Sequence, residues 1–421
     1  MADRLPKWAQ ELLDKHPGAE IPSRDNPIPS WLAQEAGKVP LWYVIREADQ
    51  PRTHHPFLVH REIKREPGQW AEIVADGWPD VQSVADQMAT RGVERVLVTG
   101  CGSAFFTAIY GQWAFERIAG VPSWAVESFE LAEYFPKGDA AKTVVLGHSG
   151  TGGSIETVQA MKTSREMGCL TVAITNTEDT PVGRASDAQL TYVTRQECGP
   201  CISVVSTRLL LELMLAIRVA DRLGRQVDPD LRDGLDRIES AGSEFLSREE
   251  EHVRKMASEH KDIESVFLVG SGPNYFSARE GTLKIEEQSI LVGKAYRTGD
   301  FHHDALSLLG PSRWVIAIEA SSAANDRLID VLRASREAGA PTLAVTWSGT
   351  SHARELGAAA DDVIELGGSL PEVLSPIPMT LVFQLLGYYL GVARGFNPDT
   401  LRTDYMPNAR AWLTAFPLGT H

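Results

Sequence analysis

The sequence predicts an α/β protein in which two tandem, doubly wound domains, each built on a parallel sheet, follow an N-terminal extension. Its 421 residues exceed the size at which one hydrophobic core usually keeps growing, so two cores are expected. A buried β-branched strand, a Gly-x-Gly turn and a helix are predicted in Val96–Ala108, and the same order returns in Val266–Ala278. A later strand, Leu170–Thr175, is likewise echoed by Thr342–Thr346. This repetition predicts two copies of one βαβ unit rather than one large sheet.

The duplication divides the chain into four expected regions. They are an N-terminal arm with a lead-in helix, a first domain, a second domain, and a C-terminal tail that closes the site, at residues 1–70, 71–246, 247–395 and 396–421. The charged stretch around 247–262 is the predicted linker between the domains.

Composition and charge exclude several kinds of partner. The formal net charge is -15 and no basic run offsets it, which argues against nucleic acid. The N-terminal segment lacks the apolar core of a signal peptide, so a cytoplasmic location is expected. The uncharged run 373–393 approaches membrane-spanning length, but Pro376, Pro378 and Gln384 favour a buried core helix and no membrane association. Four cysteines are too few for a disulfide framework, which fits a reduced compartment.

Two glycine-rich turns are candidate sites for an anionic ligand. Gly102 and Ser103 follow the first predicted strand, and Ser149, Gly150 and Thr151 follow a strand that begins at residue 143. Backbone N–H groups at such turns face the carboxyl edge of a parallel sheet, where anions bind. A dinucleotide-binding turn would need a third glycine, and no Gly-Lys-Ser/Thr sequence occurs, so we expect no cofactor. A turn that serves only as a connection is the alternative.

A candidate acid–base centre lies in the second copy. Glu280–Ile290 is predicted to form one helix on which Lys284 and Glu287, three residues apart, share a face. Farther along, His303 stands in a polar, glycine-containing segment predicted to be a loop. Glutamate and histidine suit aldose–ketose chemistry, which moves a proton between adjacent carbons through an enediol or enolamine. On spacing alone, a solvated ion pair and a surface histidine are the alternatives.

Two other kinds of site are weighed against this centre. The Cys-x-x-Cys pair Cys198 and Cys201 would suit thiol–disulfide chemistry, although the surrounding duplication does not resemble a thioredoxin fold. A tetrahedral zinc site needs four ligands, and neither a second Cys-x-x-Cys nor a His-x-x-x-His is present. We therefore expect no metal.

Six segments, taken in order, carry a family resemblance: Thr99–Ser103, Glu197–Thr207, Glu280–Glu287, His303, Glu372–Pro378 and Gln384–Tyr388. They resemble the sugar isomerase (SIS) domain family, in particular the isomerase half of glucosamine-6-phosphate synthase and the related fructosamine-6-phosphate deglycases. The resemblance extends from Phe57 to Trp412. It implies two SIS-type, flavodoxin-like αβα domains that bind a sugar or sugar phosphate.

The resemblance also implies residue roles. Glu287 falls on the proton-shuttling glutamate, Lys284 on the lysine that assists it, and His303 on a ring-opening histidine supplied by a neighbouring subunit, so a homodimer or larger assembly is expected. Ser206 and Thr207 match a Ser-Thr pair that joins the substrate turns. The implied reaction is isomerisation or deglycation at carbons 1 and 2 of an open-chain sugar.

Three departures from the family bear on the reaction. Only Ser149 keeps its hydroxyl in the turn where the family carries a Ser-x-Ser-Gly-x-Thr phosphate pattern, and Met406 stands where the family has a Schiff-base lysine. A glutaminase domain is absent from the sequence, so glutamine-dependent amide transfer is not expected. The alternatives are a plain aldose–ketose isomerase, an aminosugar-phosphate deaminase, and a non-catalytic sugar-phosphate-binding regulator.

Overall fold

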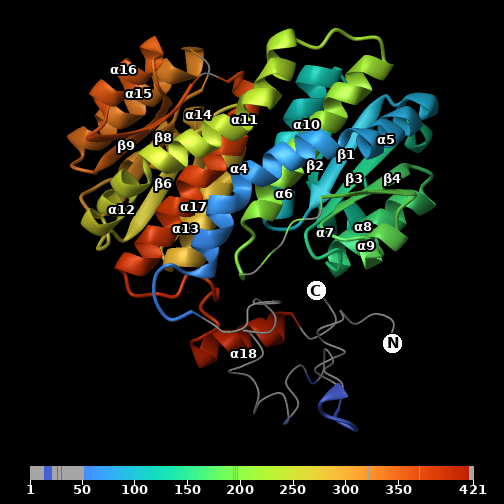
Figure 1. Ribbon diagram of the computed structural model, residues 1–421, viewed down its shortest axis with the longest axis horizontal. Helices are drawn as coiled ribbons and strands as arrows, with labels where there is room; N and C mark the ends of the chain where they lie inside the picture. The colour runs from blue at the N-terminus through green and yellow to red at the C-terminus, as the bar shows by residue number, and fades with distance from the viewer. Residues whose placement is uncertain are drawn as a thin grey trace.

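A computed structural model describes residues 14–20, 26, 30, 52–192, 194, 196, 198–320, 322–368 and 370–416. Most of the predicted N-terminal arm, Glu197 and the last five residues lie outside the described residues. The chain forms two five-stranded parallel sheets, which occupy the two sides of Figure 1, with long helices between them. The predicted α/β class with two tandem parallel-sheet domains is confirmed.

The first sheet contains the strands of the first repeat. Its spatial order is β2-β1-β3-β4-β5, with every neighbouring pair parallel, and its strands are β1 (Arg95–Gly100), β2 (Ser123–Glu127), β3 (Thr143–Ser149), β4 (Leu170–Thr175) and β5 (Ala188–Thr191). The connecting helices are α6 (Ser103–Ala114), α7 (Ser128–Glu133), α8 (Ile155–Glu166) and α9 (Pro181–Arg184). From β1 the chain adds β2 on one side of the sheet and then β3, β4 and β5 on the other side. The connections therefore leave β1 and β3 in opposite directions, which opens a crevice at the carboxyl ends of these two strands.

The second sheet repeats this topology. Its order is β10-β9-β8-β6-β7, and its strands are β6 (Ser265–Gly270), β7 (Val292–Arg297), β8 (Arg313–Ile318), β9 (Thr342–Trp347) and β10 (Asp362–Leu366). Its helices are α13 (Asn274–Ser289), α14 (Thr298–Asp304), α15 (Ser322–Glu337) and α16 (Ser351–Ala359). Counted from β6, the order is the same as in the first sheet, so the duplication seen in the sequence is a structural one.

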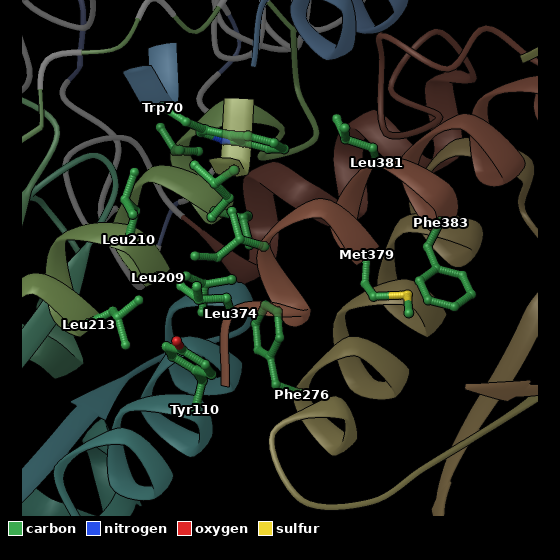
Figure 2. Packing of buried hydrophobic residues seen from close by; sticks show 14 of the residues in the cluster. Trp70, Tyr110, Leu209, Leu210, Leu213, Phe276, Leu374, Met379, Leu381 and Phe383 are labelled. Carbon is green, nitrogen blue, oxygen red and sulfur yellow. The ribbon is translucent and has the colours of Figure 1, made fainter. Parts of the chain in front are cut away.

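A shared core joins the two sheets, where two separate cores were expected. It is formed by α4 (Leu58–Asp76), α5 (Trp78–Arg91), α10 (Ser203–Arg222), α11 (Pro229–Arg248) and α17 (Pro376–Ala393), with smaller apolar clusters on the outer faces of the sheets. Figure 2 shows side chains of both halves meeting in this core: Trp70, Tyr110, Leu209, Leu210 and Leu213 from the first, and Phe276, Leu374, Met379, Leu381 and Phe383 from the second. The two halves therefore do not pack as independent units.

Two expected boundaries differ from the structure. The boundary at residue 70 falls inside α4, a continuous helix whose Trp70 is fully buried. The predicted linker is helical, because α11 runs to Arg248 and α12 (Glu250–Glu259) begins two residues later. Val253 and Met256 of α12 are buried, so apolar contacts hold this charged stretch against the core.

The uncharged run forms the core helix that was predicted. Within the described residues, Glu372–Ala393 is the one stretch long and apolar enough to cross a membrane, and its most apolar 18 residues are all buried inside the protein. A helix that is apolar on all sides belongs in a core. Its prolines stand in the first turn, where the missing N–H is not needed. Two glycines bring this helix close to α13: a methyl group at Gly387 would lie 2.8 Å from the Lys284 carbonyl oxygen, and one at Gly391 would lie 2.2 Å from that of Gln288.

Candidate active site

A cavity of about 560 Å³ opens at the carboxyl edge of the first sheet. It lies at the β1/β3 crevice, where ligands of doubly wound sheets bind. The turns after β1 and β3, the segment 196–201, helix α13 and the C-terminal tail all contribute to its wall, through residues that include Cys101, Gly102, Ser103, Ser149, Gly150, Thr151, Gln196, Cys198, Cys201, Leu283, Glu287, Leu401, Trp412 and Phe416. The five predicted turn residues and Glu287 are therefore brought together around one space.

The carboxylate of Glu287 is held by a buried ammonium group. Lys284 Nζ lies 2.5 Å from Glu287 Oε2 and 3.3 Å from Glu280 Oε1. The Lys284 and Glu280 side chains are 1% and 2% exposed, whereas Glu287 is 22% exposed on the cavity side. One carboxylate of the trio thus reaches the cavity while the other two groups fix it from behind.

Burial and charge act in opposite directions on this trio. Burial raises the pKa of Glu287, and the Lys284 ammonium offsets the rise only in part. Burial alone would lower the pKa of Lys284, but the Glu287 and Glu280 carboxylates outweigh it and the net shift is upward. Lys284 therefore stays charged at neutral pH, and Glu287 is a stronger base than an exposed glutamate.

The first repeat contacts this trio through one hydrogen bond. Ser103 Oγ, at the start of α6, donates to Glu280 Oε1 at 3.0 Å. The same Glu280 oxygen lies 3.3 Å from Lys284 Nζ, so the turn after β1 is linked directly to α13. The site is built at the junction of the two copies.

His303 does not lie at this cavity. It is exposed on α14, a short helix where the sequence predicted a loop. The helix is anchored by Phe301, which is fully buried and packs edge-on against Tyr296, with 5.4 Å between ring centroids. This apolar anchor orders a segment whose polar residues alone indicated a loop.

Ser206 and Thr207 also lie away from the cavity wall. Both are fully buried in the first turns of α10. Ser206 Oγ accepts from Trp70 Nε1 at 2.8 Å and donates to Glu66 of α4, whereas Thr207 Oγ1 donates to the Ser203 carbonyl oxygen at 2.7 Å. Ser206 thus joins α10 to α4, whereas Thr207 bonds within its own helix, and neither lies with the other predicted substrate residues.

The N-terminal helix and the C-terminal tail hold the cavity wall in place. Glu62 of α4 accepts a hydrogen bond of 3.0 Å from the Cys198 backbone N–H. Asp399 accepts from the Leu58 and Val59 N–H groups at 2.9 and 2.8 Å, and its carbonyl oxygen accepts from Gly199 N–H at 2.9 Å. The start of α4, the 198–201 segment and the tail are thereby tied together, mainly through Asp399.

Three charged cavity residues were missed by the sequence reasoning: Glu127, Glu156 and Arg208. Glu127 ends β2, so its position at the carboxyl edge of a strand was an available signal. Arg208 was visible as a charge directly after the Ser-Thr pair and before a run of three leucines. Glu156 sits in the first turn of α8 and had no distinguishing signal.

The cysteines are free and poorly suited to redox chemistry. Cys198 is fully buried, and burial followed by the nearby Glu62 and Asp399 carboxylates raises the pKa of its thiol. Burial also raises the pKa of Cys201, despite Lys284 and Arg208 nearby. A reactive thiol needs a lowered pKa, so these side chains act as packing groups. Across the described part of the chain, no cluster of His, Cys, Asp and Glu could hold a metal ion.

The equivalent crevice of the second sheet is largely filled. It leaves only about 110 Å³ beside Asn274 and Glu319. The Glu319 carboxylate accepts from Trp347 N–H at 2.7 Å and from Thr350 Oγ1 at 3.2 Å. The Glu319 carboxylate thus takes up the N–H and hydroxyl groups that could otherwise bind a ligand. Of these two equivalent crevices, the one in the first copy is open.

Comparison with known proteins identifies the family. The SIS domain model matches residues 91–217 and 261–386. Glutamine–fructose-6-phosphate aminotransferase of Methanothermobacter thermautotrophicus is 26% identical over 342 residues, which cover 80% of this chain and 55% of that protein. The aminotransferase of Aeropyrum pernix is 27% identical over 387 residues, 89% of this chain and 60% of that one. The chain thus spans little more than half the length of these relatives.

Solved structures show the same fold. The C-terminal domain of glucosamine-fructose-6-phosphate aminotransferase from Francisella tularensis superposes with a TM-score of 0.75 at 17% identity, covering 83% of this chain and all of that domain. Glucosamine-6-phosphate deaminase from Thermotoga maritima gives 0.66 at 20% identity, covering 81% and 96%. Tagatose-6-phosphate ketose/aldose isomerase from Escherichia coli gives 0.66 at 18% identity, covering 84% and 98%. With two matching domains and this shared architecture, the chain belongs to the SIS-domain family.

Proposed function

We propose that this protein is an isomerase-type enzyme that moves a proton between carbons 1 and 2 of an open-chain sugar or sugar-phosphate derivative, and that it is a deglycase releasing an amine from a fructosamine or its 6-phosphate. The observation that carries the proposal is the Glu287 carboxylate, which opens into the crevice while Lys284 holds it from behind. A general base needs this combination of access, fixed position and raised pKa.

The proposed reaction balances with water as co-substrate. Glu287 takes a proton from carbon 1 of the 1-amino-2-ketose while oxygen 2 gains a proton, which gives an enolamine. Glu287 then returns the proton to carbon 2, which leaves a C1=N iminium. Water adds to carbon 1, the C1–N bond breaks, and the products are an aldose and the free amine.

The other predicted residues have supporting roles in this proposal. Lys284 tunes and orients the carboxylate, and the turns at Gly102, Ser103, Ser149, Gly150 and Thr151 bind the sugar. Because His303 is exposed and remote from its own cavity, we propose that it serves the site of a neighbouring subunit in a homodimer. There it would assist ring opening or protonate the leaving amine, and we propose the cytoplasm as the compartment.

A second candidate is a plain isomerase or aminosugar-phosphate deaminase. Two structural relatives, a glucosamine-6-phosphate deaminase and a tagatose-6-phosphate ketose/aldose isomerase, support such a reaction at carbons 1 and 2. The same Glu287 and Lys284 would serve, without a leaving amine in the isomerase case. A non-catalytic sugar-phosphate sensor is the alternative from another class.

The test is incubation with fructosamines, their 6-phosphates and plain hexose phosphates, following amine release and aldose–ketose interconversion. Glu287→Gln should lower kcat at least 100-fold while ligand affinity changes little, because the amide cannot accept the proton. Glu286→Gln is the matched control: its Oε1 accepts from Gly293 N–H outside the cavity, and a glutamine oxygen keeps that bond.

The outcomes separate the candidates. If every substrate stays unaltered while ligands still bind, both enzyme candidates are excluded and the non-catalytic sugar-phosphate sensor remains. Turnover retained in Glu287→Gln would remove Glu287 from the mechanism.

A further inference from the structure

One wall of the cavity carries a buried cation that forms no ion pair with any of the described residues. Arg208 of α10 lines the cavity and is 1% exposed. Its Nε donates to the Val204 carbonyl oxygen at 2.9 Å, while its Nη2 has no hydrogen-bond partner among the described residues. Its charge therefore meets no ion-pair partner in that part of the chain.

Such an arrangement is costly unless a ligand completes it. A guanidinium stays charged at any physiological pH, and a buried charge without a partner loses its hydration. The charge of Arg208 acts on one buried carboxylate, Glu212, whose pKa burial raises overall, but the ion pair that Glu212 forms is with His148, at 3.1 Å. Arg208 is thus free to receive an anion.

A second unpaired group stands beside it. The Tyr192 hydroxyl is fully buried and has no hydrogen-bond partner in the part of the chain that the structure describes. Burial raises the pKa of this hydroxyl, and the positive charge of Arg208 offsets part of the rise. A methyl group at Gly150 would lie 3.9 Å from this hydroxyl, which places it behind the turn that borders the cavity. Two polar groups without partners therefore gather on one side of the site.

Two carboxylates also line the cavity. Glu127 stands at the end of β2 and Glu156 in the first turn of α8. Burial, and then the Glu127 carboxylate, raise the pKa of Cys101 to about 12, and Glu156 adds to the rise. Two carboxylates at this part of the wall oppose the binding of a phosphate dianion there.

Arg208 and Glu287 line the same cavity. Cys201, on the cavity wall, experiences the charges of Lys284 and Arg208 and then of Glu287. An anion at Arg208 would therefore lie near the carbons on which Glu287 acts. In a sugar–amino acid adduct the carboxylate is two bonds from the nitrogen on carbon 1, whereas a 6-phosphate lies at the far end of the sugar chain.

We propose that Arg208, with the Tyr192 hydroxyl, binds a carboxylate on the amine portion of the substrate, so that the enzyme acts on a non-phosphorylated sugar joined to an amino acid. This inference rests on the proposed function and names its substrate class. Arg208 is a specificity-determining residue in this scheme, and Glu287 performs the proton transfer.

The experiment compares three probes: fructosyl-glycine, fructosyl-methylamine, which lacks the carboxylate, and fructosyl-methylamine 6-phosphate. Amine release is measured as kcat/KM for the wild type, Arg208→Gln and Arg218→Gln. A charge-assisted hydrogen bond is worth roughly a 10- to 100-fold preference, so the wild type should favour fructosyl-glycine over fructosyl-methylamine by that factor. Arg208→Gln should lose the preference, because its kcat/KM on fructosyl-glycine should fall to the level that it shows on fructosyl-methylamine.

Arg218→Gln is the matched control. Arg218 lies on the same helix, 4.6 Å above the Trp78 ring and paired with Asp221, away from the cavity. It should keep the wild-type preference. The preference of the wild type needs no variant, so the inference is tested even if Arg208→Gln fails to fold.

Several results would overturn the inference and leave the proposed function standing. They are equal use of fructosyl-glycine and fructosyl-methylamine, a preference for the 6-phosphate, and a carboxylate preference that survives in folded Arg208→Gln. Absence of amine release from all three probes would overturn both the inference and the deglycase. Hexose phosphate interconversion in that case would identify the plain isomerase.

Discussion

Replacing Lys284 by methionine tests whether the buried trio is organised as described. The substitution removes an ammonium that lies 2.5 Å from Glu287 and 3.3 Å from Glu280, and leaves two carboxylates without their cation. Breaking a buried ion pair by removing one partner costs about 3 to 5 kcal/mol. Because Glu287 is 22% exposed, water relieves part of this cost, and we expect about 3 kcal/mol of unfolding free energy to be lost at pH 8.

The loss should depend on pH with a definite sign. Burial already raises the pKa of Glu287 in the folded protein, and removal of the ammonium, which lowers it, should raise it further. A carboxyl group whose folded pKa exceeds its unfolded value binds protons more tightly when folded, so its penalty disappears below the unfolded pKa and grows as pH rises through the folded one. The gap between wild type and Lys284→Met should therefore be smaller at pH 5 than at pH 8.

The assay is urea unfolding at pH 5 and pH 8, at one fixed protein concentration. Lys255→Met is the matched control, since Lys255 is 72% exposed and its 3.7 Å pair with Glu259 lies on the surface of α12. It should change the unfolding free energy by less than about 1 kcal/mol at either pH. A loss in Lys284→Met that is equal at both pH values would refute the electrostatic reasoning, as would a loss no larger than that of the control.

Two further predictions concern the assembly and the frame of the site. If His303 acts across subunits, His303→Ala and Glu287→Gln proteins should each be nearly inactive, and mixing them under subunit exchange should restore up to about a quarter of wild-type activity; no recovery in verified mixed dimers would place His303 outside the site. Asp399→Ala removes the acceptor of the Leu58 and Val59 N–H groups at the start of α4, and losing such a cap should cost about 1 to 2 kcal/mol in urea unfolding. Asn397→Ala, which removes the contact to Asp399 N–H, is the milder comparison, and an Asp399→Ala protein with unchanged stability would contradict the capping role.

The repeated parallel α/β unit could be predicted from the sequence because the signals for its strands, turns and helices are local. β4 was predicted at Leu170–Thr175 and is found with those bounds. The helix predicted at 280–290 ends within one residue of the end of α13, although α13 begins earlier, at Asn274. Strand hydrophobicity, glycine turns and i,i+3 spacing act over short distances in the chain. They were enough to give the parallel sheets and the shared face of Lys284 and Glu287.

Burial of that face was not predictable by the same means. A Lys-x-x-Glu pair on a helix is ordinarily solvated, and the pair is buried here because α17 approaches α13 at Gly387 and Gly391. These residues follow the pair by about a hundred positions. The same limit explains His303: its segment reads as a polar loop until the burial of Phe301 against the second sheet is known.

The divergence of the two copies explains why a duplicated chain has one open crevice. The turns after β1 and β6 are equivalent in the repeat, yet the helices that follow them have different tasks. Helix α13 of the second copy supplies Glu280, Lys284 and Glu287, and the first copy's Ser103 meets that helix at Glu280. The crevice of the second sheet is instead occupied by the Glu319 side chain, which is bonded to Trp347 N–H and Thr350 Oγ1. The proposed site cannot exist in either copy alone, because its proposed base, Glu287, and its proposed ligand-binding turns come from different repeats. The shared core between the sheets therefore fixes the geometry of the proposed site, since any sliding of one repeat against the other would separate Glu287 from the turns at Ser103 and Ser149.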